Sequence, residues 1–301
     1  MTLNRRHFVS LAGLAVLAGC SSADPLSQDP ASSAAPGTLV VGSQAYYSNE
    51  IIAELYAQSL EKAGFTVTRQ YQIGQREVYL PEIQGGKIDV FPEYNGNLLQ
   101  YLDKSSTATT VYAIQTELGT ALGDKLRVLD PAEASDQDSY TVTKALAEQH
   151  GLVSIADLTK LGGTIKIAAN SEFSTRPYGP KGLKAAYGVD AEVVSVEDSG
   201  GPLTVKALLD GDVQVADIYT ADPVIAKQGL VVLQDPKNLI LPQNVVPVVS
   251  EKVDDAAAAA IDKVNKELSA TELQKLNARS VDEKLGSDEI AKDWLGEKGL
   301  L

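Results

Sequence analysis

The stretch Gly86–Tyr94, with the sequence GKIDVFPEY, aligns without gaps to Gly211–Tyr219, with the sequence GDVQVADIY. Each copy reads as a glycine that ends a helix, a short buried strand, and a tyrosine eight residues after the glycine. In open parallel sheets, ligands bind beyond the carboxyl ends of the strands. The repeat therefore predicts two lobes whose tyrosines, Tyr94 and Tyr219, point into one shared cleft. The alternative is that both tyrosines fill a core.

The sequence around the repeat alternates strand and helix signals, which predicts an α/β fold with mainly parallel sheets. A helix is expected to begin at Ser48 or Asn49, and another to stop at Gly151. Caps are expected at Ser154, with Asp157 as its capping-box partner, and at Ser269. The last block, from residue 254, is expected to be all helical. Strands are expected at 39–42, 65–68, 88–91, 164–168, 191–196 and 213–218, and further helices near 144–150, 181–188 and 203–210.

The N-terminus has the layout of a secretory signal. Residues 4–20, NRRHFVSLAGLAVLAGC, place arginines before a short apolar run that ends at the only cysteine, Cys20. The run is too short to span a bilayer, and its last four residues resemble a lipobox. We therefore expect residues 1–19 to be a removed signal peptide, with the exported domain anchored to the outer face of the cytoplasmic membrane by lipidated Cys20. Residues 20–37 are expected to form a disordered linker. The adjacent arginines leave the export route, twin-arginine or general secretory, open, and the alternative for Cys20 is a buried cysteine at a helix start.

The composition argues against several classes of protein. The chain of 301 residues has a formal net charge of −14, which disfavours binding to the phosphates of nucleic acids. With two histidines, one cysteine, no glycine-rich phosphate loop and no G-x-S-x-G motif, enzyme signals are poor. We expect no enzymatic activity, no cofactor and no metal site.

Tyrosine is enriched over the other aromatic residues, with 12 tyrosines against 4 phenylalanines and one tryptophan. Such a ratio favours amphipathic aromatic surface over core filling. Tyrosine faces hold permanently charged organic cations, with about 0.5–2 kcal/mol per face. The alternative is that they cover a hydrophobic rim. The tyrosines expected where strands end or loops begin are Tyr46, Tyr47, Tyr94, Tyr140 and Tyr219.

Six stretches carry a family resemblance that covers residues 38–301 in order. They are VGSQ (41–44), EIIAELYAQ (50–58), IDVFPEYNGN (88–97), SY (139–140), SEFSTR (171–176) and VADIYT (215–220). The chain resembles the OpuAC- and ProX-like substrate-binding lipoproteins of ABC importers for glycine betaine, carnitine, choline and related osmoprotectants.

The resemblance implies a two-lobed, type II periplasmic-binding-protein-like fold with the ligand between the lobes. Lobe 1 would comprise residues 38–134 and 244–301, and lobe 2 residues 135–243, joined by crossovers near 130–138 and 241–246. The protein would be a monomer that captures a small zwitterion or quaternary amine and delivers it to the transmembrane subunits of an ABC permease.

The resemblance also implies a set of ligand-binding residues. Tyrosines would surround the trimethylammonium group, and polar residues would hold the carboxylate. Where many members have an aromatic residue in the return segment, this chain has Asn244 and its neighbours, so the fourth wall is missing or comes from Tyr46 or Tyr47. The implied cage is Tyr94, Tyr140 and Tyr219, and the implied polar contacts are Gln44, Asn97 and Arg176, with the backbone carbonyl of Asp138 facing the cation. Tyr46 and Asn244 are further candidates for contact with the ligand.

Three other functions stay open at this point. The ligand could be another small zwitterion, such as an amino acid or an ergothioneine-like betaine. The fold could carry an enzyme, against which the missing nucleophile and histidine base argue. The chain could also be a surface lipoprotein without a transport role, which would not need tyrosines at matched strand ends.

Overall fold

A computed structural model describes residues 37–301. The predicted signal peptide, Cys20 and the predicted linker up to residue 36 lie outside the described residues. Among residues 37–301, no helix combines the length and the apolar character needed to cross a membrane.

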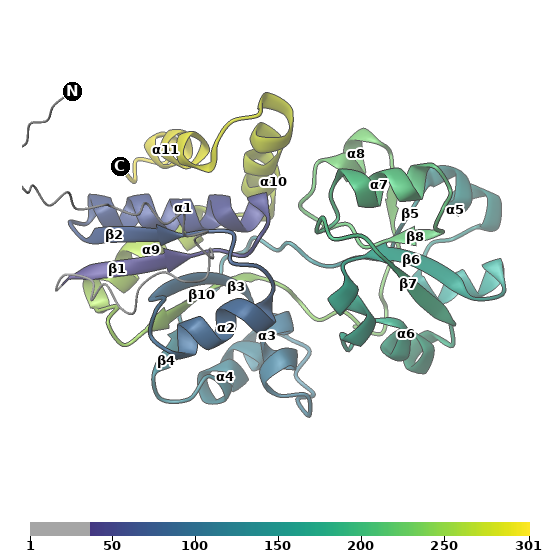
Figure 1. The fold of residues 1–301 in the computed structure, drawn as a ribbon, viewed down its shortest axis with the longest axis horizontal. Coiled ribbons are helices and arrows are strands. Elements are labelled where there is room, and N and C mark those ends of the chain that lie inside the picture. The colour runs from purple at the N-terminus through teal and green to yellow at the C-terminus, as the bar shows by residue number, and fades with distance from the viewer. Residues whose placement is uncertain (1–36) are drawn as a thin grey trace, which may run out of the picture. The chain divides into compact units, whose positions relative to one another are not determined.

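The first of two sheets has five strands in the order β2-β1-β3-β10-β4, and we call this sheet with its helices lobe 1 (Figure 1). β1 is parallel to β2 and β3, whereas β10 is antiparallel to β3 and β4. The sheet is therefore mixed, and it is mainly parallel as predicted, because β2, β1, β3 and β4 run in the same direction and β10 alone runs against them. Its strands are β1 (Thr38–Gly42), β2 (Thr66–Gln70), β3 (Val90–Tyr94), β4 (Leu126–Val128) and β10 (Val245–Ser250).

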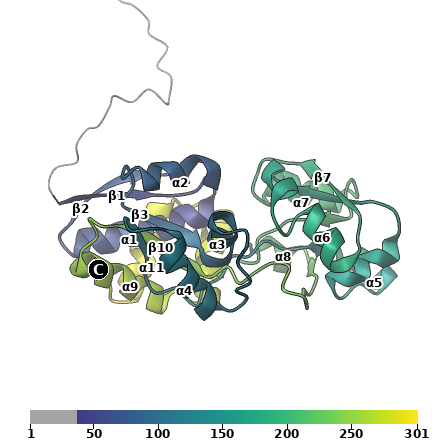
Figure 2. The same ribbon diagram turned by 90° about the horizontal axis from the view of Figure 1, so that it is seen from below.

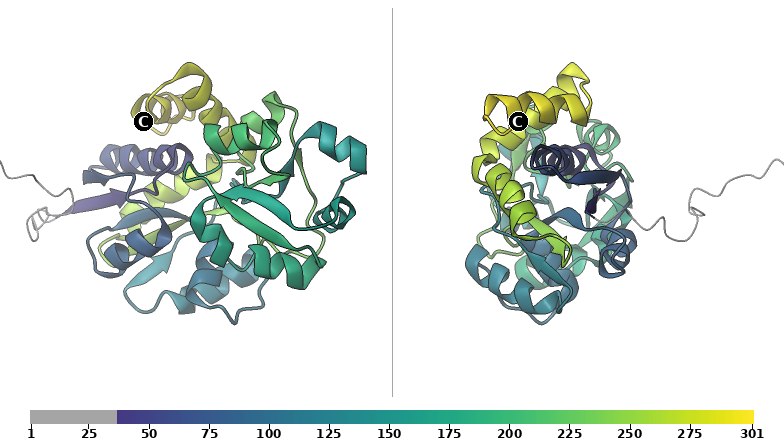
Figure 3. Two further views of the ribbon diagram at one scale, coloured as in Figure 1. Left: turned by 45° about the vertical axis from the view of Figure 1, so that its right-hand side comes forward. Right: turned by 90° about the vertical axis from the view of Figure 1, so that its left-hand side faces the viewer.

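Helices cover both faces of this sheet. Alternate residues of β1 enter different cores: Leu39 and Val41 pack with α1, α9, α10 and α11, whereas Val40 packs with α2, α3 and α4. The C-terminal helices lie beside α1 (Figure 3). The helices of lobe 1 are α1 (Tyr47–Lys62), α2 (Arg76–Gln84), α3 (Asn95–Leu102), α4 (Val111–Ala121), α9 (Asp255–Glu267), α10 (Ala270–Ala278), the short π-helix η3 (Arg279–Glu283) and α11 (Ser287–Glu297).

The second sheet, which with its helices forms lobe 2, has the strand order β7-β6-β8-β5-β9. Figure 2 shows β7 among the helices of this lobe. β6 is parallel to β7 and β8, and β5 is antiparallel to β8 and β9, so this sheet is also mixed. Its strands are β5 (Thr141–Val142), β6 (Ile165–Ala169), β7 (Ala191–Ser195), β8 (Val215–Ala216) and β9 (Val231–Val232). Its helices are α5 (Lys144–His150), η1 (Ile155–Leu161), η2 (Ser171–Thr175), α6 (Pro180–Tyr187), α7 (Pro202–Leu209) and α8 (Val224–Lys227).

Two connections join the lobes, one between β4 and β5 and one between β9 and β10. They pair with each other through the bridge Ser135–Asn244, and α3 packs onto the second of them. The Gly96 amide donates to the Pro242 carbonyl at 3.1 Å, and a Cβ on Gly96 would lie only 2.3 Å from that oxygen. Only glycine therefore fits at this position. The predicted lobe boundaries at 134/135 and 243/244 fall within these connections and stay a prediction.

Several local predictions are confirmed. Gly151 ends α5 with a φ of 58°, Ser154 and Asp157 form the expected capping box, and Ser269 caps α10. The start of α1 differs from the prediction, because Tyr46 is its N-cap and neither Ser48 nor Asn49 caps it. The side chain of Asn49 is used elsewhere, as described below.

Candidate functional site

Residues from both lobes line a central cavity of about 40 Å³. It borders a larger cavity of about 440 Å³ beside Arg176 and an apolar one of about 570 Å³ beside Tyr46. We call the three together the cleft. The central cavity is lined by Gln44, Tyr46, Gln75, Arg76, Tyr94, Asn97, Asp136, Asp138, Glu172, Arg176, Tyr178, Tyr219 and Gln243.

Three tyrosines gather in this cleft. Tyr46 lies directly before α1, Tyr94 ends β3, and Tyr219 follows β8. The Tyr46 ring lies 6.4 Å from the Tyr94 ring at 26° and 5.2 Å from the Tyr219 ring at 61°, measured between centroids. The Tyr46 hydroxyl donates to the Tyr94 hydroxyl. The cluster therefore joins the two repeat tyrosines through Tyr46, which was expected at the start of a loop and as a candidate for the fourth wall.

Tyr140 is not part of this cluster. It is 1% exposed and packs in the core of lobe 2 against Phe173. Its hydroxyl donates to the Tyr178 carbonyl at 2.5 Å. Tyr140 therefore does not line the central cavity, in contrast to the expectation that it is a cage wall: its hydroxyl reaches the backbone of the cavity-lining Tyr178, but its ring completes an apolar core.

Carboxylates adjoin the tyrosines. Asp136 is buried, and its two oxygens accept hydrogen bonds from the Ser48 hydroxyl and the Ala221 amide, each at 3.0 Å. Burial raises the pKa of Asp136 to about 7. Burial also raises the pKa of the half-buried Glu172. Together with Asp138, these groups give the cavity wall an acidic character that suits a cation.

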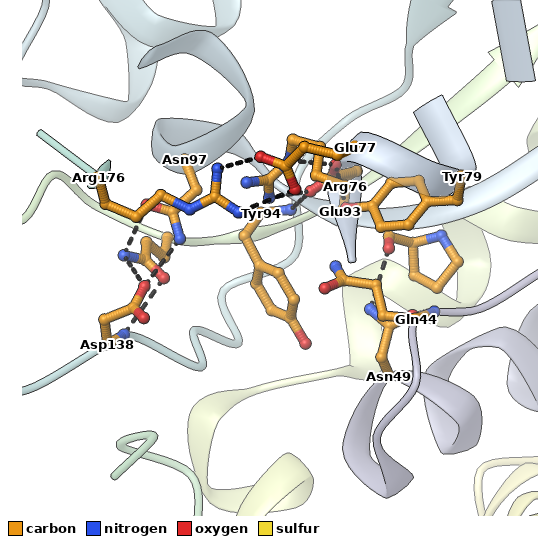
Figure 4. A network of polar contacts seen from close by, with 12 residues as sticks. Gln44, Asn49, Arg76, Glu77, Tyr79, Glu93, Tyr94, Asn97, Asp138 and Arg176 are labelled. Atoms are coloured by element: carbon orange, nitrogen blue, oxygen red, sulfur yellow. Dashed lines mark hydrogen bonds and ion pairs between the residues drawn. The ribbon is translucent and has the colours of Figure 1, made fainter. Parts of the chain in front are cut away.

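Gln44 contributes a buried donor that has no partner within residues 37–301. Its backbone amide donates to Asn49 Oδ1 at 2.8 Å, and Asn49 Nδ2 donates to the Pro92 carbonyl at 3.0 Å, which ties the end of β1 to β3. The Gln44 side chain is buried, and its Nε2 has no hydrogen-bond partner among the described residues. A buried orphan donor is costly. Figure 4 shows this amide near Tyr94, where a ligand acceptor would satisfy it.

Two arginines line the side of the cleft away from Tyr46. Arg76 uses Nε and Nη2 to bind the two oxygens of Glu93, each at 2.8 Å. Arg176, from lobe 2, pairs with Glu77 of lobe 1 at 2.8 Å (Figure 4). The expected carboxylate partner Arg176 is thus in the cleft, and it already holds a carboxylate of the protein.

The other predicted polar contacts are bound to one another. Asn97 Nδ2 donates to Asp138 Oδ2 at 2.8 Å, and Gln243 Nε2 donates to both Asn97 Oδ1 and Asp138 Oδ2, at 3.0 and 2.9 Å. Asn97 and Asp138 line the central cavity, but their side chains tie α3 to both connections between the lobes. Asn244 does not line it, because its Nδ2 donates to the carbonyls of Ala132 and Glu133.

Several cavity-lining residues were not predicted from the sequence, among them Asp136, Glu172 and Tyr178. Asp136 and Tyr178 lie in irregular segments, where no period shows the direction of a side chain. Glu172 lies within the stretch SEFSTR (171–176) that carries the family resemblance, but the resemblance implied no ligand contact for it. No group of three or more His, Cys, Asp or Glu side chains within residues 37–301 could hold a metal ion.

Comparisons with known proteins agree with this architecture. Residues 37–297 match the family model OpuAC, the substrate-binding domain of ABC-type glycine betaine transport systems. The glycine betaine-binding protein YehZ of Escherichia coli K12 is 30% identical over 274 residues, which cover 86% of this chain and 90% of that protein.

Solved structures show the same fold. The apo structure of YehZ from Escherichia coli has a TM-score of 0.63 at 29% identity and covers 88% of this chain and 99% of its own. A structure described as a glycine betaine/carnitine/choline ABC transporter has a TM-score of 0.70 at 21% identity, over 87% of this chain and 99% of its own. The predicted two-lobed, type II fold is confirmed.

Proposed function

The chain belongs to the family of substrate-binding domains of ABC-type glycine betaine transport systems, and we propose that it binds a small quaternary-ammonium zwitterion in the cleft between its lobes. Its homologues are glycine betaine-binding proteins of such systems. Capture of a betaine outside the cytoplasm and delivery to an ABC permease follow as the proposed role. A monomer suffices for it, because both halves of the proposed site come from one chain.

The observation that carries the proposal is the cluster of Tyr46, Tyr94 and Tyr219 beside buried Asp136. A trimethylammonium group donates no conventional hydrogen bond, so aromatic faces and nearby negative charge must hold it. The three rings supply the aromatic faces, and Asp136 supplies the negative charge in its ionised form. We propose Tyr46 as a cage wall in place of Tyr140, whose ring lies in the lobe 2 core.

The opposite end of the ligand would face Gln44 and Arg176. Gln44 Nε2 is a buried donor without a partner in the part of the chain that the structure describes, and the guanidinium of Arg176 matches the geometry of a carboxylate. A ligand with a cation at one end and a carboxylate at the other would satisfy both ends of the cleft. The cavity of about 40 Å³ is too small for such a ligand, so we propose that the lobes move relative to each other when it binds.

Isothermal titration calorimetry tests the proposal. Glycine betaine, choline, carnitine and the unmethylated analogue glycine are titrated into the wild type and into Tyr94→Ala and Tyr94→Phe. Tyr94→Ala should weaken betaine binding about tenfold or more, because a desolvated cation–π contact contributes about 2 kcal/mol. Tyr94→Phe should change it less than threefold, since the ring is kept.

Tyr112→Ala is the matched control, because Tyr112 is 84% exposed on α4 and lies outside the cleft. It should bind betaine as the wild type does. If glycine binds better than glycine betaine, the site serves a primary ammonium, which could donate hydrogen bonds to Asp136 and Glu172. Equal losses of betaine affinity in Tyr94→Ala and Tyr94→Phe would likewise contradict a cage built from aromatic faces.

We further propose that Cys20 carries the lipid anchor predicted from the sequence. A Cys20→Ala variant should lose labelling by a clickable fatty acid and leave the membrane fraction. Continued labelling at wild-type level would contradict the anchor without affecting the binding proposal.

A further inference from the structure

The pair between Arg176 and Glu77 bridges the lobes at the edge of the cleft. Arg176 follows η2 in lobe 2, and Glu77 lies in the first turn of α2 in lobe 1. Arg176 Nη1 donates to Glu77 Oε1 at 2.8 Å and Nη2 to Oε2 at 3.4 Å. Two nitrogens thus face two oxygens, which is how a guanidinium receives the carboxylate of a ligand. Figure 4 shows the two groups facing each other.

The two partners differ in how firmly the protein holds them. The Arg176 side chain is 11% exposed, whereas that of Glu77 is 48% exposed. Burial by itself raises the pKa of the Glu77 carboxyl, but the hydrogen bond and the charge of Arg176 outweigh burial. The pKa is lowered overall, so the group is anionic at neutral pH. Glu77 would return to water at little cost if another carboxylate took its place.

The other arginine of the cleft does not offer the same opening. Arg76 is held by Glu93, whose side chain is fully buried and also accepts hydrogen bonds from the Tyr79 hydroxyl and the Tyr94 amide. A ligand carboxylate would have to displace a buried anion with four hydrogen bonds to reach the same two nitrogens. Arg176 is therefore the guanidinium whose partner is exchangeable.

We propose that Glu77 is a built-in competitor for the ligand carboxylate and so sets the selection between betaines and choline. The inference rests on the proposed function. In the empty cleft Glu77 occupies Arg176, and a zwitterion must displace it. A ligand with a cation but no carboxylate, such as choline, leaves the pair intact. Glu77 therefore lowers affinity for betaines and leaves affinity for choline unchanged.

Calorimetry with glycine betaine and choline on Glu77→Gln and Glu77→Ala tests this role. Both variants should bind glycine betaine roughly three- to fivefold more tightly, the upper part of the range expected for removal of one half-exposed competing charge. Choline affinity should stay within twofold. The matched control is Glu82→Gln, since Glu82 lies on the same helix and pairs with Lys87 on the surface. It should change neither affinity.

Two results would overturn the competitor role. Equal weakening of both ligands would show that the pair is a latch that holds the lobes together in the bound form. Unchanged affinity for both ligands would show that Glu77 does not compete. Thermal unfolding of each variant without ligand, expected close to wild type, guards against loss of fold. A wild type that binds neither ligand would instead refute the proposed function.

Discussion

Arg76 and Arg176 lie near the same ring, with their Cζ atoms 5.9 and 6.0 Å from the centroid of Tyr101, and each binds a glutamate. Arg76 and Glu93 both belong to lobe 1 and are buried. Arg176 and Glu77 come from different lobes, and Glu77 is half-exposed. The shortest contact is 2.8 Å in both pairs. Distance alone therefore does not separate a structural pair from an exchangeable one, but burial does.

The largest expected effect comes from Glu93→Gln. The substitution leaves the Arg76 guanidinium buried without a counter-charge, and breaking a buried pair in this way costs about 3–5 kcal/mol. The free energy of unfolding, measured by urea titration, should fall by that amount. Glu77→Gln should change it by less than about 1 kcal/mol, because a half-exposed pair contributes little. Equal losses in the two variants would mean that burial does not distinguish the pairs.

Asp136 sharpens the comparison, because it is buried like Glu93 but accepts its hydrogen bonds from neutral groups. The titratable groups that raise its pKa are Asp138 and Asp222. A carboxyl with a folded pKa of about 7, above its unfolded value, takes up a proton on folding, so it favours the folded state more as the pH falls from 8 to 5. Between pH 8 and pH 5, titration of this group should raise the free energy of unfolding by roughly 2.5 kcal/mol.

The measurement is the free energy of unfolding of the wild type and Asp136→Asn at pH 5 and pH 8. Other acids also titrate, so the prediction concerns the difference between the two proteins. The variant should lose less stability than the wild type when the pH rises. A pH dependence identical in both proteins would show that Asp136 titrates normally.

The smallest effect is expected for Tyr140→Phe, which extends the comparison to the tyrosines. The substitution removes the hydrogen bond to the buried Tyr178 carbonyl and should cost about 1 kcal/mol of unfolding free energy. Because Tyr140 lies in the lobe 2 core, betaine affinity should stay within twofold. An affinity loss comparable to that of Tyr94→Ala would place Tyr140 in the binding site.

The sequence predicted elements whose signals are local. Gly151 ends α5, Ser154 and Asp157 form the capping box of η1, and Ser269 caps α10, because these signals act on the backbone within one turn. No local signal predicted a strand at β10, which contains Pro247. Proline argues against a central strand, yet β10 lies between β3 and β4, and its Pro247 stands opposite Pro92 of β3. Only the neighbouring strands make this segment a strand.

For the site, the positions of Tyr94 and Tyr219 at the ends of strands in two different lobes predicted that both reach the cleft, and both line the central cavity. Tyr140 also stands next to a strand, but its ring turns into a core, which the local sequence does not reveal. The partner of Arg176 is Glu77, 99 positions away. Tertiary structure alone decided these two outcomes, because the direction of a loop side chain and the pairing of distant charges depend on how the lobes pack.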